Sequence, residues 1–392
     1  MKASHIIAVL NICKRGDVVF LNKLLASDCN FREVVDRKGR NALHYCAETD
    51  SALLGQAKAG GRLACAELLL ESKFDLQGQA DNNAFHLAVI YSNYEMLEFL
   101  LSGSFELKNV LYQFQVDVQQ QDAQHATALH YAIQLPEAVA ASMIKCIVEK
   151  SQIRIDSPDA HRRTPLHWAA TIGAAHAASI LIELGADMTL VDESGLTALH
   201  CAASRGHSGT VDAIIKHLTK KEFEEETTSE EEEDEETAEG EPGEDQKRAI
   251  EQRNHVSTLR TRVLDAMDAD GCTPLFYSVT MGHSNVTRRL LVAGANACKR
   301  DNRGRGLLHC VSRSMVSGSA AVVPLLVAHG VNPEWVNMMG ESALHEASSN
   351  MNRECVVELL KLAPWPCLVL LLLTPRLGTQ LPSKYAQLPA GA

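Results

Sequence analysis

Hydrophobic positions recur at helical spacing in pairs of short segments along much of the chain. The segment 164–172 begins with a capping threonine and a proline, and Leu166, Ala169 and Ala170 then fall on one side of a helix. A second apolar run follows at 179–184 and stops at a glycine. Each apolar face is too narrow to fold alone, so we expect the pairs to stack on one another.

The phrase that opens this helix pair returns along the chain. Residues 164–170 read Thr-Pro-Leu-His-Trp-Ala-Ala, and 33 residues later 197–203 read Thr-Ala-Leu-His-Cys-Ala-Ala. Weaker copies keep the histidine, with Phe276 as the departure, at His44, His86, His130, His167, His200, His309 and His345. Eight residues earlier an aspartate recurs, with Gly78 and Asn337 as departures, at Asp36, Asp122, Asp159, Asp192, Asp268 and Asp301. Two columns that keep this offset predict a repeat protein.

The repeated unit resembles that of the ankyrin repeat family, whose first helix carries Thr-Pro-Leu-His-x-Ala-Ala. The resemblance covers roughly residues 5–218 and 263–362, in about nine units. It implies an all-α fold: an ankyrin-repeat solenoid of helix-turn-helix pairs with β-turn fingers. It also implies that the repeated histidines hydrogen-bond locally and to the adjoining turn, which makes them structural.

Several copies depart from the pattern. Asn83 stands where threonine is expected, Phe276 replaces the histidine, and Gly306 takes the place of a capping side chain. We expect these to be the loosest helix starts, each lacking a contact worth about 1 kcal/mol. Insertions at 49–61 and 105–121 are expected to lengthen loops on one face.

The acidity of the chain is local. The formal net charge is −12, yet residues 222–245 hold fifteen Asp or Glu and no Lys or Arg. With so little apolar surface to bury, this run is expected to be a disordered acidic loop that interrupts the solenoid. The predicted organisation is an N-terminal repeat block at 1–218, an acidic insertion with a basic re-entry at 219–262, a C-terminal repeat block at 263–362, and an irregular tail at 363–392.

The resemblance also places a binding surface. In ankyrin repeats the residues seven, six and four before the histidine lie at the finger tips, and the ends of the inner helices line the concave side. The candidate protein-binding residues are Arg37, Lys38, Arg40, His161, Arg163, Thr171, Ile172, Arg205, Arg303 and Arg305. Because several tips are basic, the expected partners are other proteins, including ones with acidic segments. We hypothesise that the run 222–245 competes with such partners as a tethered decoy.

Other classes of function find little support in the sequence. We expect no catalytic, cofactor or metal residues, because no nucleophile or phosphate-binding motif occurs and histidines one repeat apart cannot share a zinc ion. Basic tips without interleaved aromatics argue against nucleic-acid binding. Eleven cysteines without a Cys-x-x-Cys pair indicate reduced thiols in the cytoplasm or nucleus. The apolar run 367–373 is too short to cross a bilayer, so no membrane insertion is expected.

The sequence therefore favours a monomeric, non-catalytic scaffold or adaptor. The main alternative is a detached cytosolic ankyrin segment of a larger protein, such as a transient-receptor-potential-type cation channel or an inversin-like ciliary scaffold. A longer transcript that continues from Leu362 into another repeat would favour this alternative. A ubiquitin-ligase adaptor ranks third, because residues 364–392 lack a Ser-Leu-x-x-x-Cys-Arg box.

Overall fold

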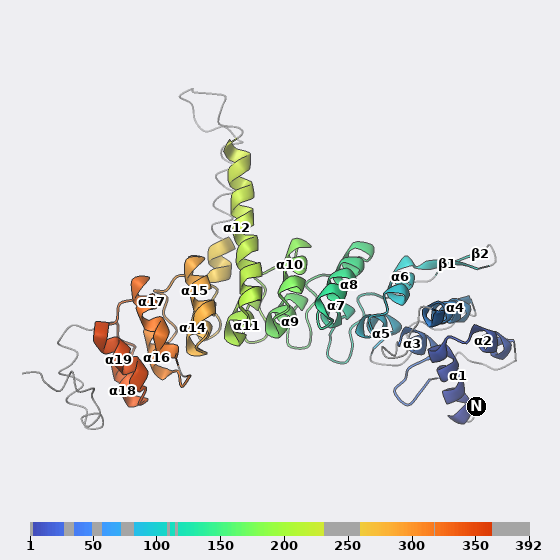
Figure 1. The fold of residues 1–392 in the computed structure, drawn as a ribbon, viewed down its shortest axis with the longest axis horizontal. Helices are drawn as coiled ribbons and strands as arrows, with labels where there is room; N and C mark the ends of the chain where they lie inside the picture. The colour runs from blue at the N-terminus through green and yellow to red at the C-terminus, as the bar shows by residue number, and fades with distance from the viewer. Residues whose placement is uncertain are drawn as a thin grey trace, which may run out of the picture. The chain divides into compact units, whose positions relative to one another are not determined.

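The computed structural model describes residues 3–26, 35–48, 57–71, 82–107, 110–113, 117–230, 259–316 and 318–362. Within these ranges the fold is helical, and nine helix pairs can be followed (Figure 1). The chain forms two compact units, Met1–Glu193 and Ser194–Ala392. No helix among the described residues is both long and apolar enough to span a lipid bilayer.

The N-terminal unit contains five of the pairs. They are α1 (Ala3–Arg15) with α2 (Val18–Leu25), α3 (Ala42–Ala47) with α4 (Ala57–Glu71), α5 (Ala84–Ile90) with α6 (Tyr94–Ser102), α7 (Ala128–Ala132) with α8 (Glu137–Lys150), and α9 (Pro165–Ile172) with α10 (Ala175–Glu183). First helices pack on first helices, as α3 does on α5, and second helices on second helices, as α8 does on α10. Small side chains allow this close approach, since Ala42, Ala88 and Ala132 are completely buried.

The C-terminal unit contains the other four. They are α11 (Ala198–Arg205) with α12 (Ser208–Glu230), α14 (Pro274–Thr280) with α15 (Ser284–Val292), α16 (Leu307–Arg313) with the short helices η1 (Ser319–Val322) and α17 (Val323–Ala328), and α18 (Ala343–Ser349) with α19 (Arg353–Leu362). A further helical stretch at 259–264 precedes α14. Stacking follows the same rule as in the first unit: α11 packs on α14, α14 on α16, and α16 on α18.

Stacking continues across the acidic insertion. α11 contacts α14 and α12 contacts α15 directly, although the acidic insertion lies between them along the chain. His283 Nε2 lies 3.1 Å from the carbonyl oxygen of Ser204, and Arg289 pairs with Asp212. The compact units consequently divide between Glu193 and Ser194 and not at the insertion. A loop inserted between stacked repeats costs little when its two ends already lie together.

The backbone of α12 is helical as far as Glu230, beyond the start of the insertion expected at 219. Glutamate and lysine, which dominate 216–226, are strong helix formers and let the helix run on past the repeat. Residues 231–258 lie outside the described residues, and with them most of the predicted disordered loop and of the basic re-entry. The predicted tail at 363–392 lies outside them as well.

The two expected loop insertions differ from simple loops. Of the first insertion, residues 57–61 belong to α4 and not to a loop. Residues 49–56, which precede α4, lie outside the described residues. Gly61 lies against the turn after α1, where a Cβ would come within 2.6 Å of the Gly16 carbonyl oxygen. The second insertion forms an antiparallel hairpin, β1 (Ser104–Leu107) and β2 (Val110–Gln113), with Ser104 opposite Gln113. This hairpin is a small addition to the all-helical fold.

Candidate protein-interaction surface

Five of the described fingers are turns closed by one carboxylate. Asp36 Oδ1 accepts the backbone N–H groups of Lys38 at 2.8 Å and Arg40 at 2.9 Å, while the Asp36 N–H donates to the Arg40 carbonyl at 2.9 Å. Asp122, Asp159, Asp268 and Asp301 repeat this arrangement. The aspartate column is thus the internal frame of the finger, and the side chains between the aspartate and the second donor are left at its tip.

The second carboxylate oxygen usually takes a donor from the following helix, nine residues on. Asp268 Oδ2 accepts the hydroxyl of Tyr277 at 2.6 Å, and Asp159 Oδ2 accepts the indole N–H of Trp168 at 2.9 Å. Tyr131 donates to Asp122 in the same way. Burial, together with the bond to Asp268, raises the pKa of the Tyr277 hydroxyl and keeps it a donor. Finger and inner helix are therefore locked together.

Histidines of the column join a repeat to the next one within each unit. His130 Nδ1 accepts the backbone N–H of Thr127 at 3.1 Å, and its Nε2 lies 3.1 Å from the carbonyl oxygen of Arg163 in the next finger. His44, His86, His200 and His309 make the same bridge to the following repeat. Since Nδ1 must accept and Nε2 must donate, the ring at His130 is neutral, and burial lowers its pKa. These imidazoles are structural, as the family resemblance implied.

Of the three helix starts expected to lack a contact, two do lack one. For Asn83 the expectation was wrong: its Oδ1 accepts the His86 N–H at 2.9 Å, because asparagine caps as well as threonine. Gly306 provides no side-chain cap. In the copy with Phe276, the hydroxyl of Thr273 is buried without a hydrogen-bond partner among the described residues, since no imidazole is there to receive it.

Neighbouring fingers are linked by backbone hydrogen bonds at their tips. In the N-terminal unit the Ala160 N–H donates to the Gln124 carbonyl at 2.9 Å, and the Glu193 N–H donates to the His161 carbonyl at 3.0 Å. In the C-terminal unit Asn302 donates to Asp270 at 2.9 Å, and Met338 donates to Arg303 at 3.1 Å. Successive tips therefore lie side by side within each unit and form a continuous row of exposed side chains.

Most of the predicted binding residues are exposed. Arg37, Lys38, His161, Arg163, Arg205 and Arg303 face solvent, and Ile172 is 49% exposed at the end of α9. Thr171 is half-buried and donates its hydroxyl to the His167 carbonyl at 2.8 Å. The finger 117–126 adjoins the finger at 154–163, so the tips with Arg37 and Arg163 are not consecutive. The structure gives rows of tips in place of one basic cluster.

Arg40 and Arg305 are instead held inside their own fingers. Arg40 Nε donates to Asp36 Oδ2 at 2.8 Å, and its guanidinium lies over the Tyr45 ring at 4.8 Å. Arg305 Nε donates to Asp301 Oδ2 at 2.7 Å. Both side chains are half-buried, and their charge is compensated by the finger aspartate. We therefore leave these two residues out of the proposed surface.

Sequence reasoning missed two basic residues at the tips of adjacent fingers. His125 and Arg162 are exposed and have left-handed backbone, with φ of +57° and +60°. The same place in other fingers is held by a glycine, as at Gly271. The sequence does contain the signal. Three residues after the column aspartate the other fingers have a glycine, and these two fingers have His125 and Arg162 in its place.

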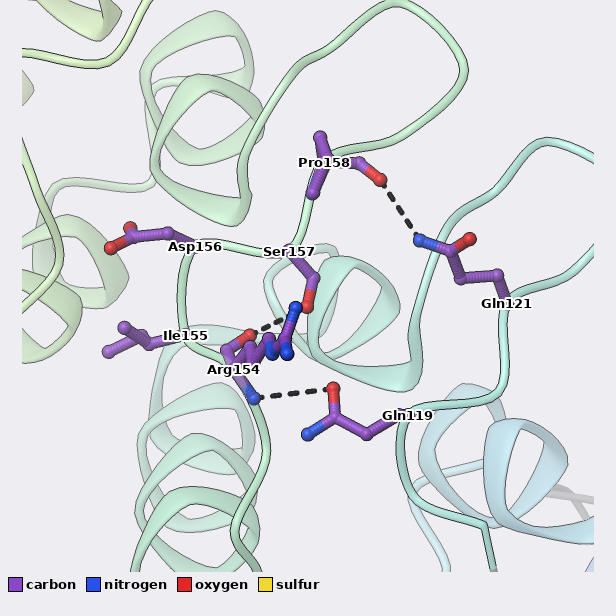
Figure 2. A pocket seen from close by; sticks show the side chains of 7 residues that line it. All are labelled: Gln119, Gln121, Arg154, Ile155, Asp156, Ser157 and Pro158. Carbon is purple, nitrogen blue, oxygen red and sulfur yellow. Dashed lines mark hydrogen bonds between the residues drawn. The ribbon is translucent and has the colours of Figure 1, made fainter.

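Two loops of the N-terminal unit line an open hollow of about 790 Å³ (Figure 2). Gln119 and Gln121 come from one loop and 154–158 from the next. Gln119 Nε2 donates to the Gln152 carbonyl at 2.8 Å, and Gln121 Nε2 donates to the Pro158 carbonyl at 3.1 Å. The glutamines thus hold neighbouring repeats together, and the hollow is the gap left between them.

The described part of the chain contains no group of residues arranged for thiol or metal chemistry. Burial, together with the nearby carboxylates of Asp268 and Asp301, raises the pKa of the Cys272 thiol to about 11, so the thiol is protonated at neutral pH. No group of His, Cys, Asp and Glu among the described residues is placed to hold a metal ion. What the described surface offers is a row of varied side chains on a rigid frame.

Comparison with known proteins shows which repeats this chain is similar to. A family model for ankyrin repeats in three copies matches residues 53–145, 102–192 and 135–225, and the single ankyrin repeat matches 270–302. Among solved structures, the ankyrin repeat domain of Bcl-3, described as a member of the IkappaB family, is 20% identical. It covers 70% of this chain and 97% of its own at a TM-score of 0.49. The human ASB11 ankyrin repeat domain is also 20% identical, covering 72% and 98% at 0.49.

Proposed function

Because the chain belongs to the ankyrin repeat family, we propose that it is a non-catalytic scaffold or adaptor that binds other proteins through its finger tips and inner-helix ends. Ankyrin repeats are protein-interaction modules, and the repeat columns of this chain fit that use. The side chains of the column aspartates and histidines form their hydrogen bonds within the frame. Variable side chains such as Arg37, His161 and Arg303 remain at the tips.

The observation that carries the proposal is the division of labour between frame and tip. Asp301, for example, is 5% exposed and accepts four donors, the backbone N–H of Arg303 and three groups of Arg305, while the side chain of Arg303 faces solvent. A rigid turn of this kind presents its tip with little loss of conformational freedom on binding. Exposed Arg37, Lys38, Arg163 and Arg303 favour partners with acidic segments.

The proposed location is the cytoplasm or nucleus, and the proposed state is a monomer. The described cysteines, including the buried Cys13, Cys46 and Cys65, are all free thiols. Free thiols packed in a core are typical of proteins in reducing compartments.

Proximity labelling with the full chain in cells tests the proposal. The combination R37E/R163E/R303E should remove a defined set of labelled proteins, because it reverses exposed charges at the tips. Arg163 Nε also lies 3.8 Å from Asp192 Oδ2, so R37E/R303E, which leaves this contact intact, should remove the same set. A matched control for the triple variant, K23E/K145E/R288E, makes the same change in net charge at exposed positions of second helices. Equal losses from both variants, or losses from neither, would show that the finger tips do not select the partners.

A further inference from the structure

Methionine has opposite positions in the two units. In the N-terminal unit the described methionines, Met96, Met143 and Met188, are core residues no more than 5% exposed. In the C-terminal unit all six are exposed, by between 45% and 81%. Five of these six, which we call the methionine surface, lie at finger tips and inner-helix ends: Met281, Met315, Met338, Met339 and Met351.

Two of the five form a finger tip. Met338 and Met339 follow Asn337 at the positions that hold Ala269-Asp270 and Asn302-Arg303 in the two preceding fingers. Tip positions are exposed in those fingers too, so the 77% and 81% exposure of the methionines is a property of the tip and not of the array end. Met338 lies over Gly304, where an added Cβ would come within 3.2 Å of its Cγ.

The other three lie at the ends of consecutive inner helices, α14, α16 and α18 (Figure 1). Side-chain bonds keep these ends together: Ser314 Oγ donates to the Thr280 carbonyl at 2.9 Å, and Asn352 Nδ2 donates to the Ser314 carbonyl at 3.0 Å. Met281, Met315 and Met351 therefore follow one another along a single edge of the unit.

Met351 also carries backbone strain. Its φ is +54°, and the equivalent position is a glycine after α9, α11 and α14 and a serine, with φ of +56°, after α5. A long side chain in the left-handed region costs conformational energy, and its 80% exposure brings no compensating burial. Packing within the described residues does not account for methionine at this position.

Arginines accompany the methionines. Arg303 lies at a finger tip, and its carbonyl oxygen accepts the backbone N–H of Met338. Arg313 is the last residue of α16, two positions before Met315. Arg353 is the first residue of α19, two positions after Met351. All three are exposed, and none forms an ion pair within the part of the chain that the structure describes. The nearby carboxylate of Glu354 accepts the Gly318 N–H at 3.1 Å. Exposed methionines and exposed arginines thus occur together at this finger tip and at these helix ends.

We infer that the methionine surface binds a peptide segment of another protein in which acidic residues alternate with bulky apolar ones. This inference rests on the proposed function and specifies the partner of the C-terminal unit. Methionine is unbranched and polarizable, so it adapts to varied apolar side chains. The arginines would pair with the carboxylates of the segment, which sets its chemistry by charge complementarity.

The test uses the full chain and three labelled synthetic peptides of equal length, measured by fluorescence anisotropy. In the first peptide Asp and Glu alternate with Leu and Phe, in the second serine replaces the apolar residues, and in the third lysine replaces the acidic ones. We expect the first to bind at least tenfold more tightly than either of the others. Equal binding of all three, or binding of none, would overturn the inference.

Variants locate the site. M338S/M339S should weaken binding of the first peptide at least tenfold, and R303E/R313E should weaken it and reduce its dependence on salt. The matched control is V292S, which changes a residue 78% exposed at the end of the second helix α15. M351G should raise thermal stability by removing strain and at the same time weaken binding. Unchanged binding in M338S/M339S and M351G would overturn the inference even if the peptide bound elsewhere.

The remaining outcomes assign the surface to other occupants. Concentration-dependent dimers that M338S/M339S converts to monomers would assign it to a second copy of the chain, and retention on anionic lipid vesicles would assign it to a membrane. Either result would overturn the inference. If the peptides fail while the finger-tip variants still lose proteins in proximity labelling, the proposed function stands and only this assignment of the partner falls.

Discussion

Asn337 Nδ2 donates to Glu346 Oε1 at 2.9 Å, in the place where Asp268 accepts the hydroxyl of Tyr277 at 2.6 Å. The two pairs have the same spacing along the chain and opposite hydrogen-bond polarity. At position 337 an amide that can donate stands in place of a carboxylate that can only accept, and at position 346 a carboxylate stands in place of the tyrosine hydroxyl. Asn337 is therefore matched to Glu346, and its departure from the aspartate column leaves the finger intact.

This exchange predicts a strong coupling between the two positions. N337D should lower the free energy of unfolding by roughly 2 kcal/mol or more, because it places two carboxylates against each other in a buried site. The double variant N337D/E346Y should recover most of this loss by recreating the aspartate–tyrosine pair. A double-mutant cycle from urea unfolding measures the coupling, and purely additive effects would contradict the account.

Phe276 offers a gain of stability. F276H should raise the free energy of unfolding by about 1 kcal/mol, because an imidazole there would accept the buried hydroxyl of Thr273 and could donate to the Arg305 carbonyl. Thermal and urea unfolding measure the change. H309F makes the reverse substitution in the next repeat, where His309 accepts from Gly306 at 3.2 Å and lies 3.1 Å from the Glu341 carbonyl. It should be destabilising, and a fold indifferent to both changes would refute the bridging role of the histidines.

The bridging histidines also predict a pH dependence. Burial lowers the pKa of His86 and His130 from an ordinary value of 6.5, so each binds a proton more readily when unfolded. Their contribution to stability is complete above about pH 7.5 and is lost as the pH falls below 6.5, by up to about 1.4 kcal/mol per pH unit for each ring.

Urea unfolding between pH 7.5 and 5.5 checks this prediction. The pKa of Asp36 and that of Asp159 are lowered from 3.8, because burial, which raises them, is outweighed by their hydrogen bonds. Those carboxylates contribute to pH dependence only in more acidic solution. H130N should flatten the profile, and a slope unchanged by this substitution would assign the effect to other groups.

The finger arginines should separate into two classes. R305A should destabilise the chain by about 1–2 kcal/mol, because it leaves a carboxylate that is 5% exposed without its paired charge. R303A, two residues away, should change stability by less than about 0.5 kcal/mol, since its side chain faces solvent. Thermal unfolding of the two variants compares them. Equal effects would mean that Arg303 also belongs to the frame.

The repeat itself was determined by the sequence. The spacing of His167 and His200, with an aspartate eight residues before each, identified the unit and its inner helices, because every copy must place the same bonds at the same positions. The resemblance to ankyrin repeats then placed the finger tips. Exposure of Arg37 and Arg303 followed from their place at a tip. Such features depend on local geometry, which recurs wherever the phrase recurs.

Only the tertiary structure decided which other residue of the chain each side chain contacts. Whether an arginine in a finger reaches outward, like Arg303, or folds back, like Arg305, depends on the position of the nearest carboxylate. Stacking of α11 on α14 across the acidic insertion depends on contacts between residues far apart in the chain. The exposure of the C-terminal methionines likewise depends on what the neighbouring repeats leave uncovered. Hydrophobic spacing fixes which face of a helix is buried, but not which of the remaining side chains find a partner in the next repeat.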